Sequence, residues 1–367
     1  MVKPRGKYGM NKNLKSLKNF WKGKKVFLTG HTGFKGSWLS IILSILEAKI
    51  IGYSLKANRI SFFKLAKLQN IMQESIVGDV RDYEKLKNSV KKTRPDLIIH
   101  MAAQSLVRKS YKNSKNTFDV NIGGTVNILE IVKELKRPKF LLIVTTDKVY
   151  KNNNQGKHYS EDDPLGGLDP YSNSKSCAEL VTESYRKSFF NKNGIKVATA
   201  RSGNVVGGGD FSEDRIIPDY IKALKNKKNL IIRSPNAIRP WQHVIEPLIG
   251  YLKLLELLTK KNKNFSSAWN FGPNNKNFYS VTDIINIMNN DFNNKVKIKI
   301  KTNSSTNFEE SKVLLLKSKK AISKLKWFPK YNINETINFT TDWYKNYLKK
   351  KNLLKFSQMQ IKNYLAN

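Results

Sequence analysis

Tyr171 and Lys175, in the segment DPYSNSKSCAEL, are a first pair of residues whose types and spacing could do chemistry. They are four residues apart, so on a helix they share one face. A lysine beside a tyrosine stabilises the phenolate and lowers its pKa, which lets the tyrosine take a proton from an alcohol. The same spacing is common on solvated helix faces. The pair therefore predicts catalysis only if the fold brings a ligand to it.

A second group of reactive side chains ends the segment FLLIVTTDKVY, residues 140–150. The apolar run predicts a buried strand, and Thr146, Asp147 and Lys148 follow at its carboxyl end. An acid beside an amine there is either a solvated strand end or a pair of proton-transfer groups. Ligands of parallel α/β sheets bind at the carboxyl ends of the strands, so the type of sheet decides between these interpretations.

A glycine-rich segment near the N-terminus, FLTGHTGFKGSWLSIIL, follows one apolar run and opens another. Gly30, Gly33 and Gly36 allow a tight turn and close approach of the backbone to a pyrophosphate, and a helix N-terminus behind them supplies amide donors. Thr32 and Phe34 lie in the same loop. In this strand–turn–helix setting the pattern predicts dinucleotide binding.

The end of the second apolar run, at Ser54, lacks the acidic residue that usually binds the ribose of NAD. Ser54 could bind a ribose hydroxyl, whereas Lys56 or Arg59 could bind a 2′-phosphate. This loop alone therefore leaves NAD and NADP open. Asp79, followed by Val80, is placed to reach the adenine, or it caps a helix that starts near Asp82.

Six short apolar runs predict strands, and helical patterns at 120–136 and 176–190 lie between some of them. The strands are expected at 24–30, 49–55, 74–80, 96–103, 139–146 and 196–202. This alternation predicts an α/β fold, a Rossmann-like doubly wound parallel sheet with a smaller mixed α/β substrate-binding lobe.

We expect the cofactor-binding domain at 1–202 plus about 236–262, and the substrate lobe at about 203–235 plus 263–355, where glycines and prolines interrupt the pattern. Residues 356–367 are expected to form a C-terminal tail.

The composition excludes several classes of protein. The 367 residues contain one cysteine, Cys177, and four unpaired histidines, so neither a disulfide framework nor a metal site is expected. The formal charge of +39 comes mainly from lysines spread along the chain, without a nucleic-acid-binding motif. The N-terminus lacks an apolar signal segment and no run reaches transmembrane length, which predicts a cytoplasmic protein without a membrane or nucleic-acid partner.

The motifs occur in an order that resembles the extended short-chain dehydrogenase/reductase family over almost the whole chain. They are TGHTGFKG, GDV, HMAAQ, TTDKVY, YSNSK, ARSGNVVGGG, RPWQHV and WNFGP. An acid–base pair directly after the threonine resembles the nucleotide-sugar 4,6-dehydratases of this family, in which the pair is usually Asp-Glu. The Asp147-Lys148 pair resembles the branch that acts on CDP-glucose.

The resemblance implies a redox-neutral dehydration with NAD as cofactor and CDP-glucose as substrate. Tyr171, Lys175 and Thr146 would oxidise C4, Asp147 would be the acid and Lys148 the base of water elimination between C5 and C6, and hydride would return to C6. The product would be the 4-keto-6-deoxy sugar, a precursor of surface polysaccharide such as the O-antigen of lipopolysaccharide. A lysine is a poor base unless burial or nearby cations lower its pKa.

The same resemblance implies residues that line the two ligand sites. Ala102 and Ala103 would let the chain pass close to the cofactor. Gln104 would touch both ligands. The remaining substrate-side residues would be Arg108, Asn204, Arg215 and Arg239, with the arginines suited to a diphosphate. Arg201 forms either part of this wall or a strand-edge salt bridge.

Rival interpretations remain at this level. The chain could be an epimerase or a dehydratase for another nucleotide sugar, since no rule converts pocket residues into a base. The charge could also indicate a polyanion-binding protein without enzymatic activity. The apolar faces of helices 111–136 and 176–190 could pair across a homodimer axis, or in a tetramer of dimers, or pack within one chain.

Overall fold

The structure is a computed structural model that describes residues 12–153, 156–260, 265–273, 279–300 and 313–366. Parts of the predicted domains and the last residue of the predicted tail, at 1–11, 154–155, 261–264, 274–278, 301–312 and 367, lie outside these ranges.

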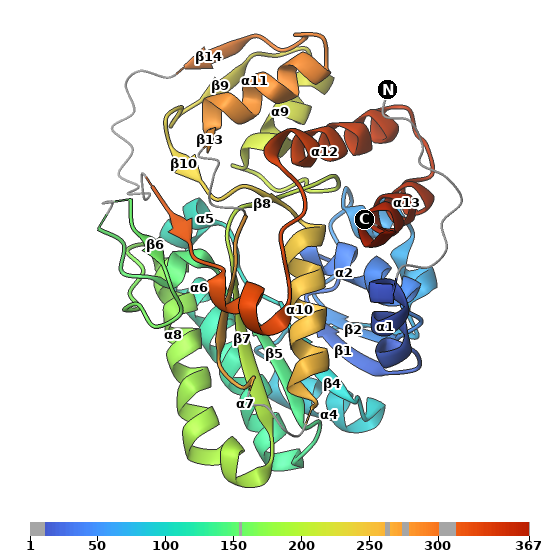
Figure 1. Ribbon diagram of the computed structural model, residues 1–367, viewed down its shortest axis with the longest axis vertical. Coiled ribbons are helices and arrows are strands. Elements are labelled where there is room, and N and C mark those ends of the chain that lie inside the picture. The colour runs from blue at the N-terminus through green and yellow to red at the C-terminus, as the bar shows by residue number, and fades with distance from the viewer. Residues whose placement is uncertain (1–11, 154–155, 261–264, 274–278, 301–312, 367) are drawn as a thin grey trace.

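A parallel sheet forms the centre of the molecule (Figure 1). Within the described residues its strands follow the order β12-β7-β5-β4-β1-β2-β3. Their bounds are β1 Lys25–Thr29, β2 Lys49–Ser54, β3 Glu74–Val77, β4 Leu97–His100, β5 Phe140–Val144, β7 Lys196–Ser202 and β12 Ala268–Phe271. All six predicted strands are confirmed, and β12 adds an edge strand beside β7.

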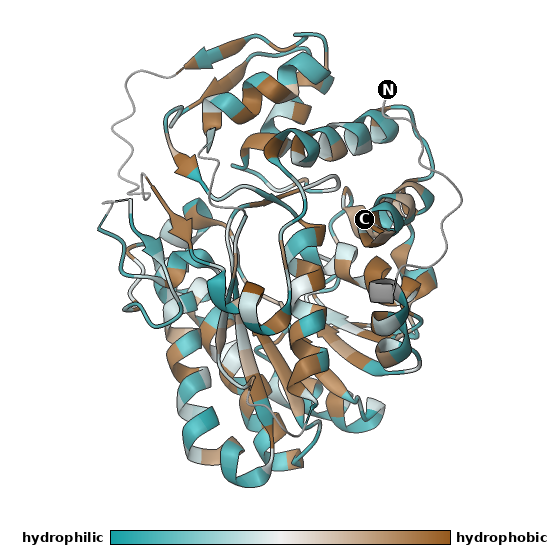
Figure 2. Ribbon diagram, viewed as in Figure 1, coloured by the Kyte–Doolittle hydropathy of each residue, from teal (hydrophilic) through white to brown (hydrophobic). Residues whose placement is uncertain are grey.

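Alternate residues of each strand point to opposite faces of this sheet, and both faces are covered. Val26, Leu28 and Ile99 belong to one apolar cluster. Phe27 and Ile98, their neighbours along the chain, belong to a second cluster on the other side. Figure 2 shows the strands largely hydrophobic, whereas hydrophilic and hydrophobic residues alternate along the outer helices. Continuous apolar strands are therefore explained by burial on two faces, which confirms the doubly wound fold.

Two different sets of helices cover the two faces of the central sheet. The first face carries α1 Lys12–Trp21, α2 Phe34–Ile45 and α10 Ile245–Leu258, and α13 Leu353–Ala366 packs on α2. The second face carries α4 Tyr83–Thr93, α7 Gly124–Leu135 and α8 Pro170–Tyr185.

The strand order reverses at β1, which lies between β2 and β4. Two loops at the carboxyl ends of neighbouring strands meet there. Gly30, after β1, has a φ of 78°, and a Cβ on it would lie 2.8 Å from the backbone N of Ala102 after β4. Only glycine allows this approach, and a crevice between two such loops is where ligands bind in open α/β sheets.

A smaller group of elements lies beyond the carboxyl ends of the strands, at the top of Figure 1. It contains α9 Ile216–Lys225, β9 Leu230–Ile232, β10 Ile238–Arg239, β13 Tyr279–Ser280, α11 Val281–Asp291, β14 Ile298–Ile300 and α12 Ile333–Leu348. β14 pairs with β9 in parallel, and β10 pairs with β13 antiparallel.

Two details differ from the expected domain ranges. Residues 268–271, placed in the substrate lobe, form β12 of the central sheet because they hydrogen-bond beside β7. Most of the expected tail belongs to α13, which is stabilised by packing on α2 and α12. The division of the chain into two domains otherwise stays a prediction.

Short elements make up the connections. They are α3 Phe62–Leu65, η1 Leu68–Ile71, α5 Val107–Lys112, α6 Ser114–Phe118, η2 Asp119–Gly123, η3 Asp147–Val149, β6 His158–Tyr159, η4 Arg186–Phe190, η5 Asn191–Asn193, β8 Val205–Val206, β11 Gln242–His243, β15 Leu315–Leu316 and η6 Ala321–Leu325. None of the helices in the described ranges combines the length and the apolar character needed to cross a membrane.

Candidate active site

A cleft of about 710 Å³ lies at the carboxyl ends of the strands, below the smaller group of elements. The loops after β1, β2, β3, β4, β5 and β7 form one side of it. Residues 210–218 and 234–241 form part of the other. All predicted site residues except Gln104 line this cleft. Segments far apart in the sequence therefore meet in one cavity.

The glycine loop forms a cradle for a phosphate group. Gly33 is the N-cap of α2, and no side chain caps this helix. A Cβ on Gly36 would collide with the carbonyl oxygen of Gly30. The close-packed glycines hold the backbone amides of the first turn toward the cleft, where the helix dipole favours an anion. The residues present therefore fit the pyrophosphate of a dinucleotide.

The neighbouring loops are fastened to one another by side chains. Thr32 Oγ1 lies 2.8 Å from Ser54 Oγ and donates to the Leu55 carbonyl at 3.1 Å. Asp79 is paired with Arg81 at 2.6 Å, and this arginine lowers the pKa of the Asp79 carboxyl. Asp82, not Asp79, caps α4. The alternative role of Asp79 as the helix cap is thus wrong, while its contact with an adenine stays a prediction.

Thr146, Tyr171 and Lys175 converge from β5 and α8. The Lys175 amine donates to the Val144 carbonyl at 3.1 Å, and burial lowers the pKa of this amine to about 8. Burial raises the pKa of Tyr171 to about 12, opposed by a hydrogen bond with Thr146 and by the charge of Arg215. Burial outweighs these two opposing contacts, so the pKa of Tyr171 lies above its ordinary value, whereas the spacing predicted a lowered pKa.

Asp147, the acid of the strand tip, is enclosed by the protein, with 1% of its surface exposed. Thr146 Oγ1 donates to Asp147 Oδ1 at 2.9 Å, whereas Asp147 Oδ2 is buried without a hydrogen-bond partner. Burial raises the pKa of this carboxyl, against the opposing charges of Lys148, Arg239 and Lys35. A protonated carboxyl is suited to donate a proton. The strand tip is thus not a solvated turn.

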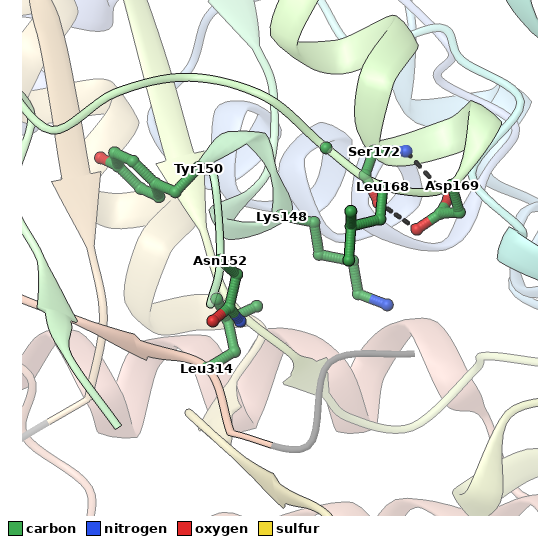
Figure 3. A pocket seen from close by; sticks show the side chains of 8 residues that line it. Lys148, Tyr150, Asn152, Leu168, Asp169, Ser172 and Leu314 are labelled. Atoms are coloured by element: carbon green, nitrogen blue, oxygen red, sulfur yellow. Dashed lines mark hydrogen bonds between the residues drawn. The ribbon is translucent and has the colours of Figure 1, made fainter. Parts of the chain in front are cut away.

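Lys148 lines both the main cleft and a small side pocket. In that pocket it lies with Leu168 and Asp169 of the loop before α8 and with Leu314 (Figure 3). Asp169 accepts from the Ser172 amide at 3.0 Å and so caps α8. The loop next to Lys148 is therefore tied to the helix that carries Tyr171.

Cationic side chains from both sides of the cleft line it as well. Arg215 precedes α9 and donates to Asp210 at 2.9 Å. Arg239 lies on β10 and is largely buried. Arg108 lies 3.7 Å from Asp214. Together with Asn204 they give the cleft the donors that a diphosphate requires.

The side chain of Gln104 does not line the cleft, although it was predicted to touch both ligands. Its amide nitrogen donates to the Leu106 carbonyl and to Thr117 Oγ1, both at 3.1 Å, and its Oε1 accepts from the Leu106 amide at 2.8 Å. These contacts point the side chain toward the interior of the protein and away from the cleft. Arg201 forms a buried salt bridge with Glu179 at 2.9 Å, which confirms the structural alternative.

Lys35 is a cleft residue that the sequence analysis missed. Its amine donates to Ser202 Oγ, at the end of β7, at 2.8 Å. A basic residue in the first turn of a helix was an available signal, because the helix dipole disfavours a cation there. Among the described residues, no group of three or more His, Cys, Asp or Glu side chains could hold a metal ion.

Residues 27–340 match the family described as GDP-mannose 4,6 dehydratase. The chain belongs to this family. As a member of the GDP-mannose 4,6 dehydratase family, it is 42% identical over 355 residues to the CDP-glucose 4,6-dehydratase of Salmonella typhimurium, covering 95% of this chain and 98% of the relative. It is also 27% identical to the human dTDP-D-glucose 4,6-dehydratase, covering 88% of this chain and 90% of that one.

Solved structures share the fold of this family member. Epimerase Mth375 of Methanothermobacter thermautotrophicus superposes with a TM-score of 0.79 at 22% identity, covering 92% of this chain and 97% of the other. The dTDP-glucose 4,6-dehydratase of Bacillus anthracis, in complex with NAD, gives a TM-score of 0.73 at 21% identity, covering 90% of this chain and 100% of the other.

Proposed function

We propose that this chain converts CDP-glucose into CDP-4-dehydro-6-deoxyglucose, with NAD as the cofactor. The observation that carries the proposal is the 42% identity to a CDP-glucose 4,6-dehydratase over nearly the full length of both chains. The glycine cradle and the buried Thr146–Asp147 tip support the same reaction class.

Bound NAD would accept hydride from C4 and later deliver it to C6. Tyr171 takes the proton of the C4 hydroxyl, and its hydrogen bond with Thr146 opposes the effect of burial on its pKa. Lys175, held on the Val144 carbonyl, keeps a positive charge next to that position below a pH of about 8. Arg108, Arg215 and Arg239 hold the diphosphate, and the sugar extends toward Thr146 at the end of β5.

The elimination then needs two proton transfers on adjacent carbon atoms. Lys148 removes the C5 proton, the C5–H electrons form the C5–C6 double bond, and the C6–O bond breaks. Asp147 donates its proton to the departing oxygen, and water leaves. When hydride returns to C6, Lys148 gives its proton back to C5, which completes the 4-keto-6-deoxy sugar. Burial of Asp147 supports this role because it favours the protonated acid.

The experiment that tests the proposal is incubation with CDP-glucose and, separately, with dTDP-glucose, UDP-glucose and GDP-mannose. We expect the 4-keto-6-deoxy product with CDP-glucose, without net accumulation of reduced cofactor. Turnover with a different nucleotide only would refute the substrate and leave the reaction class intact. Lack of product with all four would refute the reaction class as well.

Assembly, location and pathway belong to the same proposal. Leu180, on α8, and Phe189, in η4, are 54% and 40% exposed, which supports a homodimer formed along α7 and α8. Sedimentation of the protein and of a Leu180→Arg variant would test this. A cytoplasmic place in deoxysugar synthesis for surface polysaccharide is proposed on the same grounds as the substrate.

A further inference from the structure

Lys35 is a charged residue of the cleft to which the proposed reaction assigns no task. It is the second residue of α2, where the partial positive charge of the helix terminus opposes a cation. A residue that contradicts its local environment is expected at functional sites. The contacts of the Lys35 amine therefore indicate its role.

Three elements fix the position of the Lys35 amine. It donates to Ser202 Oγ at 2.8 Å, and Tyr251 of α10 donates to the same oxygen at 2.8 Å. Ser202 and Tyr251 are both fully enclosed. The amine of a long, flexible side chain is thus held at the end of β7, facing the cleft.

The unpartnered oxygen of Asp147 lies at the same strand end. Gly203 follows Ser202 directly, and a Cβ built on Gly203 would lie 3.1 Å from Asp147 Oδ2. The charge of Lys35 lowers the pKa of Asp147, and the charge of Asp147 raises the pKa of Lys35. The two groups therefore influence each other's proton.

Other ionisable groups surround this pair. Those that act on Asp147 or Lys35, or are acted on by them, are Lys148, Tyr171, Lys175, Arg215, Arg239 and Tyr251. Burial, together with the charges of Arg215 and Lys175, lowers the pKa of Lys35 to about 7, and the charge of Asp147 opposes this. Lys35 is thus able to change its charge near neutral pH, whereas the arginines are not.

We infer that Lys35 is a positioning residue for the elimination, because its anchor on Ser202 holds an amine at the strand end where the unpartnered oxygen of Asp147 lies. A charged Lys35 favours the Asp147 carboxylate, and a neutral Lys35 favours the acid that donates to the C6 oxygen. The inference rests on the proposed function for its catalytic consequence, but not for the electrostatic coupling itself.

The coupling can be measured without substrate. The infrared band of the protonated Asp147 carboxyl, identified by its loss in Asp147→Asn, is followed against pH in the protein with NAD. In Lys35→Met the band should persist to a pH higher by about one unit, the shift expected from one nearby charge. Lys35→Arg, which keeps the charge, should not raise it. Lys91→Met, an exposed lysine of α4, is the matched control.

The dehydration rate provides the second readout. The rate is expected to fall at alkaline pH as Asp147 loses its proton. In Lys35→Met this fall should move to higher pH, in parallel with the infrared band of the Asp147 carboxyl. A purely structural role would lower the rate at every pH without moving this fall. Ser202→Ala removes the hydrogen bond that anchors Lys35 but keeps the lysine. It should shift the infrared band of Asp147 in the same direction as Lys35→Met, and it replaces that variant in the test if Lys35→Met does not fold.

Two results would overturn the inference: an unchanged band in both variants, or a loss of NAD affinity with the Asp147 band unmoved. The wild-type protein separates this inference from the proposed function. If it dehydrates none of the nucleotide sugars, the proposed function fails, and the infrared shift still decides the coupling.

Discussion

The hydroxyl of Thr146 donates a 2.9 Å hydrogen bond to the buried carboxyl of Asp147. The same threonine is hydrogen-bonded to Tyr171. A threonine hydroxyl has one proton and two lone pairs, so Thr146 can donate to Asp147 while it accepts from the Tyr171 hydroxyl, but it can donate to only one of them once Tyr171 has lost its proton. The residue assigned to oxidation at C4 and the residue assigned to loss of water are therefore linked through one side chain.

Replacing Asp147 with Asn should separate the two halves of the reaction. The side chain keeps its size but loses the proton for the departing oxygen, so dehydration should fall by about a hundredfold or more. Oxidation at C4 should continue, and the reduced cofactor should accumulate, which its absorbance would reveal. The exposed Asp162→Asn variant is the control. Full dehydration by Asp147→Asn would contradict the assigned role.

Lys148→Ala should block removal of the C5 proton and leave some oxidation at C4. The measurement is the entry of solvent deuterium at C5, followed by mass spectrometry during incubation in heavy water. We expect little deuterium in the variant, because the base on the cleft wall is missing. Deuterium entering at the wild-type rate would exclude Lys148 as the base.

Gly36→Ala should weaken NAD binding, because the new Cβ would collide with the Gly30 carbonyl oxygen and push the loop apart. We expect the dissociation constant, measured by fluorescence titration, to rise at least about tenfold, equivalent to about 1.4 kcal/mol. Gly123→Ala is a matched control, since a Cβ there meets nothing within 4 Å. Equal NAD affinity of the two variants would count against the cradle.

Glu246 should make stability depend on pH. It accepts from the Lys330 and Tyr331 amides and from the Tyr364 hydroxyl, each at 2.8 Å, and burial raises its pKa to about 7. Because the folded protein holds this proton more tightly than the unfolded chain, the stabilisation is complete below the unfolded pKa near 4.5 and declines as pH rises through about 7.

Urea unfolding at several pH values tests this prediction. Between pH values of about 4.5 and 7 the wild-type protein should lose on the order of 3 kcal/mol through this group. Glu246→Gln should show a smaller decline, because its amide does not ionise. Glu84→Gln, an exposed acid of α4, should behave as wild type. An identical decline in all three proteins would show that Glu246 ionises normally.

The strand positions and the glycine loop were predictable because both depend on local features. Apolar runs between turn residues mark buried parallel strands, and glycines at 30, 33 and 36 mark a close backbone approach. By contrast, β12 was missed because its assignment depends on pairing with β7, which lies far away in the sequence. Gln104 was misplaced because a motif does not state which way a side chain turns.

The sequence by itself determined the chemical groups, their order and the sheet that collects them at one edge. The burial of those groups was decided only by the tertiary structure. Enclosure raises the pKa values of Asp147 and Tyr171 and lowers those of Lys175 and Lys35, because each charged form loses contact with water. The contact of Lys35 with Ser202 likewise joins residues 167 positions apart, which the folding of β1 and β7 into one sheet brings together.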